Sequence, residues 1–484
     1  MRTIDTEVLI IGSGAGGSVT AARLAEAGRS VLVAEEGPWY APDAQVPFSL
    51  DEFTARYRHQ GACAALGNPG IAFAEGRCVG GSTEINSGLY HRLPDHLASE
   101  WRDTYSIADF DDGTLAKYAA EIEDVITVST VPGEPPASSQ ALGRGATALG
   151  WRSVEFARVF AYDDKGRGTK QTMSRTMIPR AVAAGTVIQP DCAIVKLERA
   201  QHRVTGAVAV LTLPDGSKES VRIRADDVFV CGGAIQSPAL LQRSGFRRNI
   251  GGGLKFHPTV KVAARFTEPY DHDDVPMHRV TEFAPYLTIG GSASRRGQVA
   301  LAIADAAPEQ LESVIERWED IVVYYAAIRS QGSGRVQAMP GFRAPLVTYH
   351  MTDADMSRLA RGLVHLGEVL LAAGAVELFP SITEGPIVTE RSGLGAWWDA
   401  LTRARSKLMT VHLTSTVRMG EASDRTGADS FGRVWETENL YVNDASLLPD
   451  APGVNPQAAI MAIAARNADA YLSGVSTGAS VSRA

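Results

Sequence analysis

The chain has 484 residues, more than one hydrophobic core usually organises, so two domains are expected. Its net charge of −8 argues against nucleic-acid binding, which needs a basic face. No stretch is apolar over the length that crosses a bilayer, and the N-terminus lacks a basic-then-apolar signal. We therefore expect a cytoplasmic protein without membrane insertion. The four cysteines and ten histidines show no metal-ligand spacing, and no metal site is predicted.

Residues 1–37 predict a βαβ unit that binds a dinucleotide. Glu7–Ile11 is a short β-branched apolar run, which is typical of a buried parallel strand. Apolar positions at helical spacing follow over Ala15–Ala27, and a second apolar strand runs over Ser30–Ala34. The connection between the first strand and the helix carries a G-x-G-x-x-G fingerprint, at Gly12, Gly14 and Gly17.

Each residue of the fingerprint has a physical role. Gly12 permits the tight turn, Gly14 lets the backbone approach a pyrophosphate, and Gly17 lets the helix pack close to the strand. The N-terminus of the helix offers unpaired N–H groups to the phosphates. Glu35 ends the second strand, where a carboxylate can accept hydrogen bonds from an adenosine ribose. The segment therefore predicts an adenine dinucleotide, NAD or FAD.

A glycine-rich loop at residues 76–88 is the next informative stretch. Its small residues are flanked by hydroxyl and amide groups, which suits a loop that lies flat against a bound ring system. Gly80 and Gly81 allow backbone N–H groups to approach ligand atoms closely. The alternative is a glycine-rich surface loop without a ligand.

Two later segments are typical of the same nucleotide-binding domain. One contains strand patterns followed by a small-residue turn and a helix that begins near Ser237, since proline at the next position suits a first helical turn. The other contains a strand and a closing helix. The strands are expected at Ala193–Leu197, Ala207–Val210, Asp227–Val230 and Asn439–Val442, and the closing helix at Ala458–Leu472.

The material between these segments has a different character. It mixes strands such as Ile321–Tyr325 with an amphipathic helix over Ala354–Ala373 and has no glycine fingerprint. The predicted fold class is α/β, with a Rossmann-like domain and an inserted α+β substrate-binding domain built on an antiparallel sheet and helices. We assign residues 1–100, 180–255 and 410–475 to the discontinuous nucleotide-binding domain, 101–179 and 256–409 to the substrate-binding domain and cap, and 476–484 to a flexible tail.

The C-terminal segment supplies the candidate reactive groups. His412 titrates near neutrality, so it can take a proton from an alcohol while hydride leaves the carbon. The side-chain amide of Asn455 can bond the same alcohol oxygen. A structural role in capping or turn formation is the alternative for each residue.

Five ordered motifs resemble those of the glucose–methanol–choline (GMC) flavin oxidoreductases, from Glu7 to about Leu472. They are the fingerprint with Glu35, the loop at residues 76–88, and the segments at residues 233–241, 412–420 and 443–456. The resemblance implies FAD as the dinucleotide. It implies that His412 is the active-site base, or the group that orients and polarises the hydroxyl. Asn455 would be its partner, as in the branch that includes cholesterol oxidase.

The resemblance also implies how FAD is held. The isoalloxazine ring would lie beside the loop at residues 76–88, Asp444 would hold the ribityl or pyrophosphate region, and the backbone of Val195 would face the adenine. The helix opened by Pro456 and Gln457 would stabilise negative charge on the reduced flavin through its dipole. The predicted cofactor-binding residues are Gly12, Gly14, Gly17, Glu35, Glu36, Arg77, Gly80, Gly81, Ser82, Asn86, Ser87, Gly88, Val195, Gly233, Asp444, Asn455, Pro456 and Gln457.

The chain also departs from the family pattern. Ile85 stands where some members attach FAD covalently through a histidine, so non-covalent FAD is expected, with His91 as the alternative anchor. Leu413 and Ser415 stand where relatives usually have proline and glycine, which predicts a different loop shape after His412. Glu84 stands where relatives commonly have an apolar or small residue. We expect a buried hydrogen-bonded acid there; the alternative is a group that faces the active site and attracts a substrate ammonium.

The expected function is FAD-dependent oxidation of an alcohol to an aldehyde or ketone by hydride transfer to flavin N5. The expected substrate is a sugar, aminosugar or polyol, with a sterol or long-chain alcohol as the alternative. A non-redox FAD-dependent lyase or isomerase is the alternative class. His257, before Pro258, is expected to have a structural role. The sequence leaves open whether oxygen or another carrier accepts the electrons, and it leaves open the oligomeric state.

Overall fold

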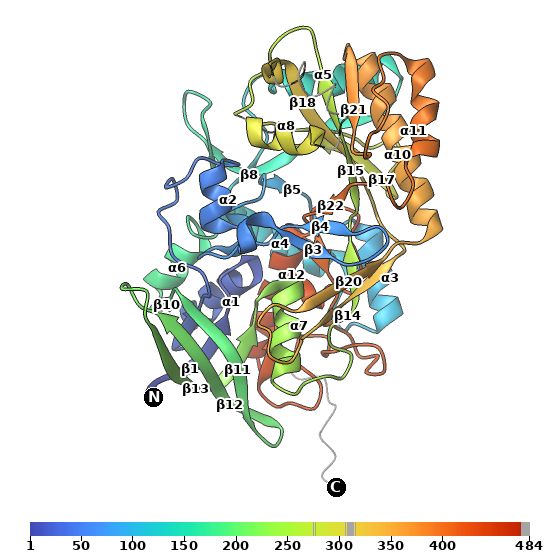
Figure 1. The fold of residues 1–484 in the computed structure, drawn as a ribbon. Coiled ribbons are helices and arrows are strands. Elements are labelled where there is room, and N and C mark those ends of the chain that lie inside the picture. The colour runs from blue at the N-terminus through green and yellow to red at the C-terminus, as the bar shows by residue number, and fades with distance from the viewer. Residues whose placement is uncertain (274, 276, 305, 307–313, 315, 476–484) are drawn as a thin grey trace.

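The computed structural model describes residues 1–273, 275, 277–304, 306, 314 and 316–475. The tail predicted at residues 476–484 lies outside them. Figure 1 shows one sheet with α1 and α6 in the lower half of the molecule, and a second sheet with α8, α10 and α11 in the upper half. No helix in the described part of the chain is long and apolar enough to span a membrane.

The predicted βαβ unit is confirmed. β1 (Arg2–Ile11), α1 (Ala15–Glu26) and β2 (Val31–Ala34) follow one another, and β1 pairs in parallel with β2 on one side and β13 on the other. β1 begins five residues earlier than expected. Its first residues are partly exposed, so they lack the apolar pattern of a buried strand, but they pair with β13 from Val221 onward.

The lower sheet has the strand order β10-β2-β1-β13-β12-β11, and β24 pairs with β13 in parallel. The predicted strands are therefore confirmed, and β11, β12 and β13 are each longer than expected. Their bounds are β10 (Val187–Gln189), β11 (Cys192–Ala200), β12 (Arg203–Thr212), β13 (Lys218–Val230) and β24 (Leu440–Val442).

α7 (Gly233–Arg243) begins four residues before the predicted start near Ser237, so that prediction was wrong. Pro238 lies inside the helix and has no N–H to give to the carbonyl of Ala234. The hydroxyl of Thr416 donates to that carbonyl instead, at 2.7 Å. A residue nearly two hundred positions away thus allows the helix to start early.

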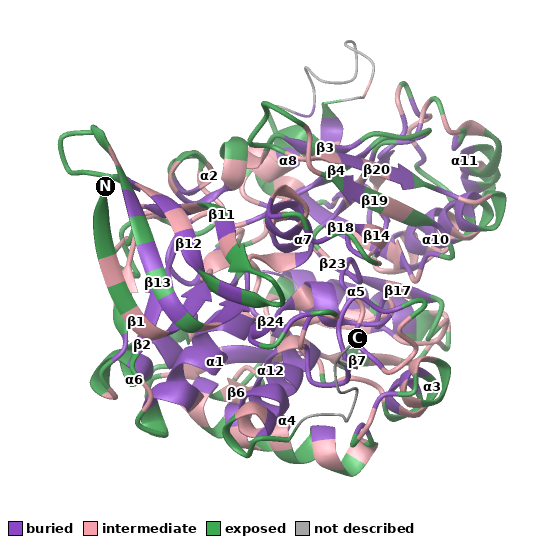
Figure 2. Ribbon diagram, turned by 90° about the horizontal axis from the view of Figure 1, so that it is seen from below, coloured by how far each residue is buried: buried purple, intermediate pink, exposed green. Residues whose placement is uncertain are grey.

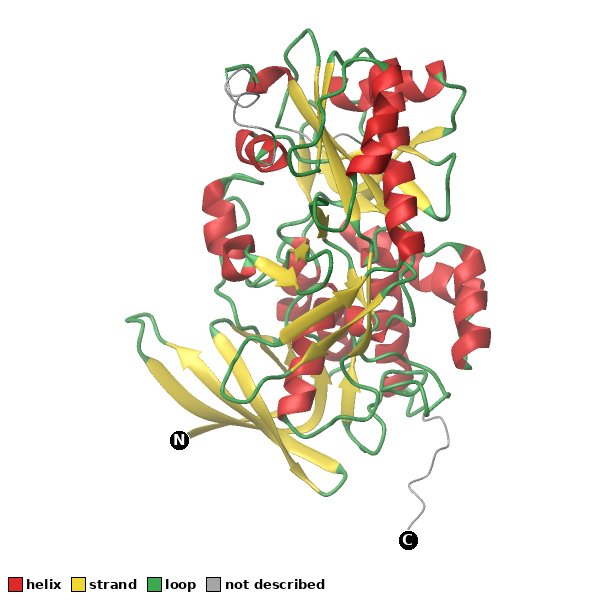
Figure 3. Ribbon diagram, turned by 45° about the vertical axis from the view of Figure 1, so that its right-hand side comes forward, coloured by secondary structure: helices red, strands yellow, loops and turns green. Residues whose placement is uncertain are grey.

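The upper sheet has nine strands, in the order β3-β4-β22-β15-β18-β17-β16-β7 with β21 beside β15. Figure 3 shows its strands flanked by helices, among them the long α10. The strands are β3 (Cys63–Ala65), β4 (Ile71–Phe73), β7 (Ser153–Glu155), β15 (Thr259–Arg265), β16 (His278–Val280), β17 (Leu287–Gly291), β18 (Ile321–Ile328), β21 (Glu377–Pro380) and β22 (Leu408–Thr410).

Two small sheets and the remaining helices complete the described fold. The small sheets contain β5 (Leu89–Tyr90), β6 (Val128–Ser129), β8 (Ala157–Tyr162) and β9 (Gly168–Lys170), and β14 (Gly252–Phe256), β19 (Ser333–Gln337), β20 (Leu346–His350) and β23 (Leu413–Thr414). The helices are α2 (Leu50–Arg56), α3 (Asp95–Tyr105), α4 (Asp112–Ile126), α5 (Ala137–Ala148), α6 (Met177–Ala183), α8 (Arg296–Ile303), α10 (Asp353–Ala372), α11 (Gly395–Ala400) and α12 (Gln457–Leu472).

Some segments pack in a different half of the molecule from the one predicted from the sequence. The hairpin β3–β4 lies within residues 1–100 yet belongs to the upper sheet, because β4 pairs with β22. Conversely, α4 lies within residues 101–179 and α3 extends into them, but their buried side chains join the cores of the lower half. Figure 2 shows both cores as buried segments beneath exposed loops. The predicted α/β class with an antiparallel second sheet is confirmed.

Candidate active site

The glycine fingerprint lies where the C-terminal ends of β1 and β13 meet. Gly12 has a φ of +103°, and a Cβ there would lie 2.5 Å from the Cys231 carbonyl oxygen. A Cβ on Gly17 would lie 2.0 Å from the Gly12 carbonyl oxygen. A Cβ on Gly14 would meet no atom of the described residues within 4 Å. The packing of the protein itself therefore requires Gly12 and Gly17, whereas Gly14 borders open space.

The N-terminus of α1 fits a bound phosphate group. The helix begins directly after Gly14, and no side chain of the described residues caps it. The free N–H groups of a first turn and the helix dipole attract phosphate. The open space beside Gly14 is what the close approach of a pyrophosphate needs.

Glu35 is buried beside the fingerprint. Its Oε2 accepts hydrogen bonds from Ser13 N at 3.0 Å and Ser13 Oγ at 2.7 Å, and its Oε1 accepts one from Gly37 N at 2.9 Å. A carboxylate has about four acceptor sites, so one is left for a further donor such as a ribose hydroxyl. Burial raises the pKa of Glu35, against the effect of these hydrogen bonds. The ribose contact itself stays a prediction.

The loop at residues 76–88 lies directly against the fingerprint. A Cβ on Gly81 would be 2.8 Å from the Cα of Gly14, and Gly80 N donates to Ser13 Oγ at 3.0 Å. Gly80 and Gly81 both have positive φ, at +94° and +57°. Glycine is thus needed at both positions for the loop to lie over the first turn of α1.

The far end of this loop is tied to α12. Asn86 Nδ2 donates to Gln457 Oε1 at 2.7 Å, and Gly88 N donates to Asn86 Oδ1 at 2.9 Å. Lys170 Nζ donates to the Asn86 carbonyl oxygen at 2.8 Å. α12 begins at Gln457, directly after Pro456, and no side chain of the described residues caps it. The predicted helix start is confirmed, and its free N–H groups have the arrangement expected to stabilise negative charge.

Glu84 forms a buried ion pair with Arg56. Arg56 Nη1 lies 2.8 Å from Glu84 Oε2, and the two side chains are only 4% and 2% exposed. Ser174 N donates to the other carboxylate oxygen at 3.3 Å. This confirms the expected buried, hydrogen-bonded acid and leaves the alternative role, attraction of a substrate ammonium, without support.

Glu36 and Arg77, two predicted cofactor residues, belong to an ion-pair cluster. Glu36 lies 2.8 Å from the guanidinium of Arg58, 3.1 Å from that of Arg343 and 3.5 Å from that of Arg77. Burial acts to raise the pKa of Glu36, but the three cations lower it to about 2. Glu36 is thus ionised, and the direct cofactor contacts of both residues stay predictions.

Asp444 joins the turns that follow β13 and β24. Its Oδ2 accepts hydrogen bonds from Gly233 N at 2.7 Å and from the Ser237 hydroxyl. Its Oδ1 accepts from Ser446 N at 2.8 Å and from the Ser446 hydroxyl. The carboxylate therefore organises the edge of the sheet at which Gly12 also lies. Its predicted contact with the ribityl or pyrophosphate region is not needed for this role and stays a prediction.

Three predicted cofactor residues remain. Val195 lies at a bulge in β11, the strand whose first residue, Cys192, donates its N–H to the Glu35 carbonyl at 2.8 Å. Val195 is therefore close to the end of the cofactor site at which adenosine is expected. Ser82 accepts a hydrogen bond from Gly76 N at 2.9 Å, and Ser87 is half-buried in the same loop.

The two predicted catalytic residues line one small cavity. His412 follows β22, and Asn455 precedes α12. The cavity has a volume of about 20 Å³. Its other lining residues come from the loop after β5, from the link between β14 and β15, from the turn before α12 and from β16, β17 and β18 of the upper sheet. They are His91, His257, Arg279, Thr288, Tyr325, Ala327, Ile328, Gly453 and Val454. The described part of the chain contains no group of three or more His, Cys, Asp or Glu side chains that could hold a metal ion.

A chain of hydrogen bonds fixes the protons on the two central histidines. Gly453 N lies 2.9 Å from His257 Nε2, and His257 Nδ1 lies 2.8 Å from His412 Nδ1. A backbone N–H can only donate, so His257 Nε2 carries no proton. The proton of neutral His257 is then on Nδ1 and is donated to His412 Nδ1. Neutral His412 consequently carries its own proton on Nε2.

Both histidines are neutral near pH 7. Burial lowers the pKa of His412 to about 4 and lowers the pKa of His257 well below its usual value. In this resting arrangement His412 Nε2 is a hydrogen-bond donor and not a proton acceptor. The prediction of a structural role for His257 is therefore incomplete, because the hydrogen bond from His257 also sets the tautomer of His412, the predicted base.

The loop after His412 keeps a backbone shape that favours glycine. Ser415 has a φ of +77° and is fully buried, and its hydroxyl donates to Thr414 Oγ1 at 2.9 Å. A serine at such a φ is strained, and residues of this kind cluster at functional sites. The prediction that the loop differs in shape from that of relatives stays a prediction.

Sequence reasoning missed the cavity residues of the upper sheet. Arg279, Thr288 and Tyr325 lie on β16, β17 and β18, and only the pairing of these strands brings them together. The sequence of β18 (Ile321–Ile328) is a continuous apolar run, so it does not mark Tyr325 and Ala327, and only the structure shows that these two are less buried than their neighbours.

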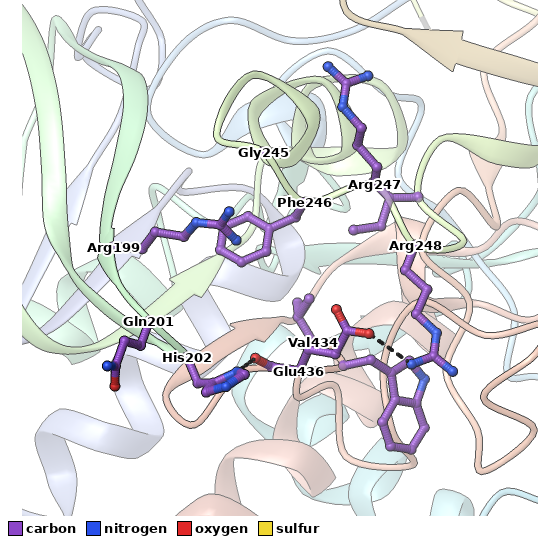
Figure 4. Close-up of a pocket in the computed structure, with 11 residues that line it drawn as sticks. Arg199, Gln201, His202, Gly245, Phe246, Arg247, Arg248, Val434 and Glu436 are labelled. Carbon is purple, nitrogen blue, oxygen red and sulfur yellow. Dashed lines mark hydrogen bonds and ion pairs between the residues drawn. The ribbon is translucent and has the colours of Figure 1, made fainter. Parts of the chain in front are cut away.

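A larger hollow, of about 670 Å³, lies elsewhere, between the β11–β12 turn and the end of α7 (Figure 4). Its residues make contacts with one another: Arg248 lies 3.0 Å from Glu436, and the Arg199 guanidinium lies over the Phe246 ring. None of the predicted site residues lines it. Its lining residues are Arg199, Gln201, His202, Gly245, Phe246, Arg247, Arg248, Ile250, Val434, Trp435 and Glu436.

Family models and relatives agree with this geometry. Two models, both described as GMC oxidoreductase, match residues 7–259 and 330–464, which together are more than half of the chain. The chain is a GMC oxidoreductase. It is 38% identical over 482 residues to the GMC-type oxidoreductase y4nJ of Sinorhizobium fredii, with 97% of this chain and 95% of that protein covered.

This GMC oxidoreductase also resembles more distant proteins. It is 25% identical over 515 residues to long-chain-alcohol oxidase FAO1 of Arabidopsis thaliana, covering 95% of this chain and 66% of that protein. Among solved structures, pyridoxine 4-oxidase from Mesorbium loti shares the fold, with a TM-score of 0.73, 20% identity and coverage of 97% and 99%. GMC oxidoreductases bind FAD, so the predicted cofactor is confirmed. Its non-covalent attachment stays a prediction, with His91 as the other candidate anchor.

The contrast between Gly14 and Gly17 leads to a first testable prediction. Gly14→Ala is expected to leave the free energy of unfolding of the apoprotein unchanged, because its Cβ meets no described atom, yet to weaken FAD binding roughly 10- to 100-fold. Gly17→Ala is the matched variant, and it should destabilise the apoprotein by about 1–3 kcal/mol. Urea unfolding and flavin titration measure the two effects. Equal loss of stability in both variants would contradict the prediction.

Proposed function

We propose that this GMC oxidoreductase oxidises an alcohol group on a small polar substrate, with His412 and Asn455 holding the hydroxyl. The observation that carries the proposal is that both side chains line one cavity, between the upper sheet and the N-terminus of α12. The long-chain-alcohol oxidase and pyridoxine 4-oxidase that the chain resembles act on alcohols, which supports the same reaction class.

The cofactor supplies the hydride acceptor when it is bound. Asn455 has a side-chain amide that can bond the hydroxyl oxygen, and it has no hydrogen-bond partner among the described residues. In the resting state His412 donates from Nε2 to that oxygen, which orients the hydroxyl and stabilises negative charge that develops on it. His412 thereby polarises the alcohol before the proton leaves.

His412 can also adopt a second tautomer, in which its own proton is on Nδ1 and Nε2 is free. In this form it accepts the proton of the substrate hydroxyl on Nε2. His257 then carries its proton on Nε2, facing Gly453 N–H, so one hydrogen bond of the chain is lost. Leaving a buried donor unpaired costs about 1–3 kcal/mol. This cost is small beside the barrier of an enzymatic reaction, so both roles of His412 are compatible with the same geometry.

A sugar, aminosugar or polyol hydroxyl is the proposed substrate group. The cavity is small, and most of its lining side chains are polar: three histidines, an arginine, a threonine, a tyrosine and an asparagine. These groups can bond the hydroxyls of a polyhydroxylated substrate, which supports this class over a sterol or long-chain alcohol. The experiment that identifies the substrate also shows whether oxygen or another carrier accepts the electrons.

An anaerobic panel of alcohols tests the proposal on the purified holoenzyme. Sugars, aminosugars, polyols, a sterol and a long-chain alcohol are each added, and the loss of flavin absorbance is recorded. Reduction by the polyhydroxylated compounds is expected, and readmitted air then reports whether oxygen accepts the electrons. Reduction by the sterol or long-chain alcohol alone would overturn the substrate class. Conversion of a compound without any flavin reduction would favour a lyase or isomerase.

A further inference from the structure

Three strands of the upper sheet place polar donors in one row above the cavity. Arg279 on β16 is paired with Gly290 on β17, and Gly290 is paired with Tyr325 on β18. Side chains at paired positions point to the same face of a sheet. A Cβ on Gly290 would lie 2.8 Å from the Tyr325 hydroxyl, so the absence of a side chain there makes room for the tyrosine. Thr288, in the next row, lines the same cavity.

Arg279 carries a charge that no protein group neutralises. Its Nε is buried and unpartnered, and no carboxylate of the described residues forms an ion pair with its guanidinium, which interacts electrostatically with the neutral Tyr325. Its only ring contact among these residues is the face of Phe156, 5.2 Å from the guanidinium carbon. Burial lowers the pKa of Arg279, which reports the same unfavourable environment for its charge. A partly buried cation usually has a partner, so its absence indicates a place for a ligand.

Other buried arginines of the chain are compensated. Arg56 pairs with Glu84, and Arg466 donates to the carbonyls of Asp109 and Ser430. Arg279 differs from both because it faces the cavity that holds His412. The contrast shows that the fold supplies partners to buried guanidinium groups where no ligand is expected.

We propose that Arg279 binds a carboxylate of the substrate, so that the substrate is an alcohol bearing an acidic group, a hydroxy acid or sugar acid. The inference rests on the proposed function and names its substrate class. A planar guanidinium matches a carboxylate through two parallel hydrogen bonds. Tyr325, whose pKa is raised by burial to about 12, stays protonated and offers a further donor, as does the hydroxyl of Thr288.

The rest of the cavity agrees with an anion. None of its lining residues is an aspartate or glutamate. His91 Nε2 is buried and has no partner in the described structure, so it can also approach a polar ligand atom. A substrate ammonium would meet the charge of Arg279 instead, and like charges disfavour binding. Among the polyhydroxylated alcohols of the proposed function, the acidic ones are therefore favoured over aminosugars.

Matched substrate pairs test the inference on the holoenzyme. Each pair has the same carbon chain with and without a carboxylate: D-gluconate with D-glucitol, D-glucuronate with D-glucose, and glycolate with ethylene glycol. Anaerobic flavin reduction gives kcat/KM for each compound. The acid of at least one pair is expected to be preferred, and Arg279→Gln should lower kcat/KM for that acid on the order of 100-fold while its neutral partner changes little. Arg361→Gln, at an exposed position of α10, is the matched control.

A binding measurement separates the inference from the proposed function. The melting temperature of each holoenzyme is recorded with the same acids and with their neutral partners. Stabilisation by an acid that is lost in Arg279→Gln, without flavin reduction by any alcohol, would overturn the proposed function and keep the carboxylate site. Equal responses to the acid and neutral members of every pair, or equal loss for both in Arg279→Gln, would overturn the inference.

Discussion

Replacement of His412 by alanine is expected to slow reduction of the bound flavin by an alcohol roughly 100- to 10,000-fold, with FAD still bound. In the proposed function, His412 both donates to the hydroxyl oxygen and, in its second tautomer, accepts the proton. Its hydrogen bonds within the described structure go to His257 and Thr410, and not to the fingerprint or the loop at residues 76–88, so the cofactor site should be intact. Stopped-flow flavin absorbance under anaerobic conditions measures the rate, and flavin content measures the binding.

The pH dependence of the wild-type rate follows from the same environment. Because burial lowers the pKa of His412 to about 4, the ring is neutral from pH 6 to 8. The free enzyme should therefore show no loss of rate near 6.5, the ordinary pKa of histidine, and should lose activity only as the pH approaches 4. A rate that halves near pH 6.5 in the wild type and not in the His412→Ala enzyme would contradict this environment.

His257→Gln is the matched control for the pair. A glutamine can accept from Gly453 N and donate to His412 Nδ1, so it preserves the hydrogen bonds without an exchangeable ring proton. If polarisation by His412 Nε2–H dominates, this variant should keep most of the activity. A loss as large as that of His412→Ala would show that the proton must pass through both rings, and retention of full activity by His412→Ala would refute the assignment of His412.

Replacement of Arg56 by methionine is expected to lower the free energy of unfolding by about 3–5 kcal/mol. The substitution leaves the carboxylate of Glu84 buried without its ion-pair partner. Arg56 also donates to Gln45 and to the carbonyl of Ala41, and these contacts are lost with the pair. Because Glu84 lies within the loop at residues 76–88, FAD affinity should fall as well. Urea unfolding and flavin titration measure the two losses.

Two further variants separate the charge effect from the loss of contacts. Glu84→Leu in the Arg56→Met background removes the uncompensated charge, so it should recover part of the stability. Arg222→Met breaks an ion pair with Glu198 in which the side chains are 45% and 30% exposed, and it should change stability by less than about 1 kcal/mol. Equal effects of Arg56→Met and Arg222→Met would contradict the role of burial.

The sequence predicted those parts of the site that depend on neighbouring residues. The strand, the three glycines of the fingerprint, the helix and Glu35 are consecutive, so their order alone indicates how they meet. The start of α12 also depends on a neighbouring residue, Pro456, and the helix begins at Gln457 as expected. The start of α7 was missed because it depends on Thr416, which comes from a distant segment.

By itself, the sequence predicted FAD as the cofactor and an N-terminal βαβ unit to bind it, and it predicted that the reactive groups lie near the C-terminal end. Only the tertiary structure decided what surrounds His412. The chain from Gly453 through His257 joins three segments, and the register of β16, β17 and β18 brings Arg279 and Tyr325 together. Hydrogen bonds between distant segments and the pairing of strands leave no periodic pattern in a sequence, so neither the tautomer of His412 nor the charge above it was visible there.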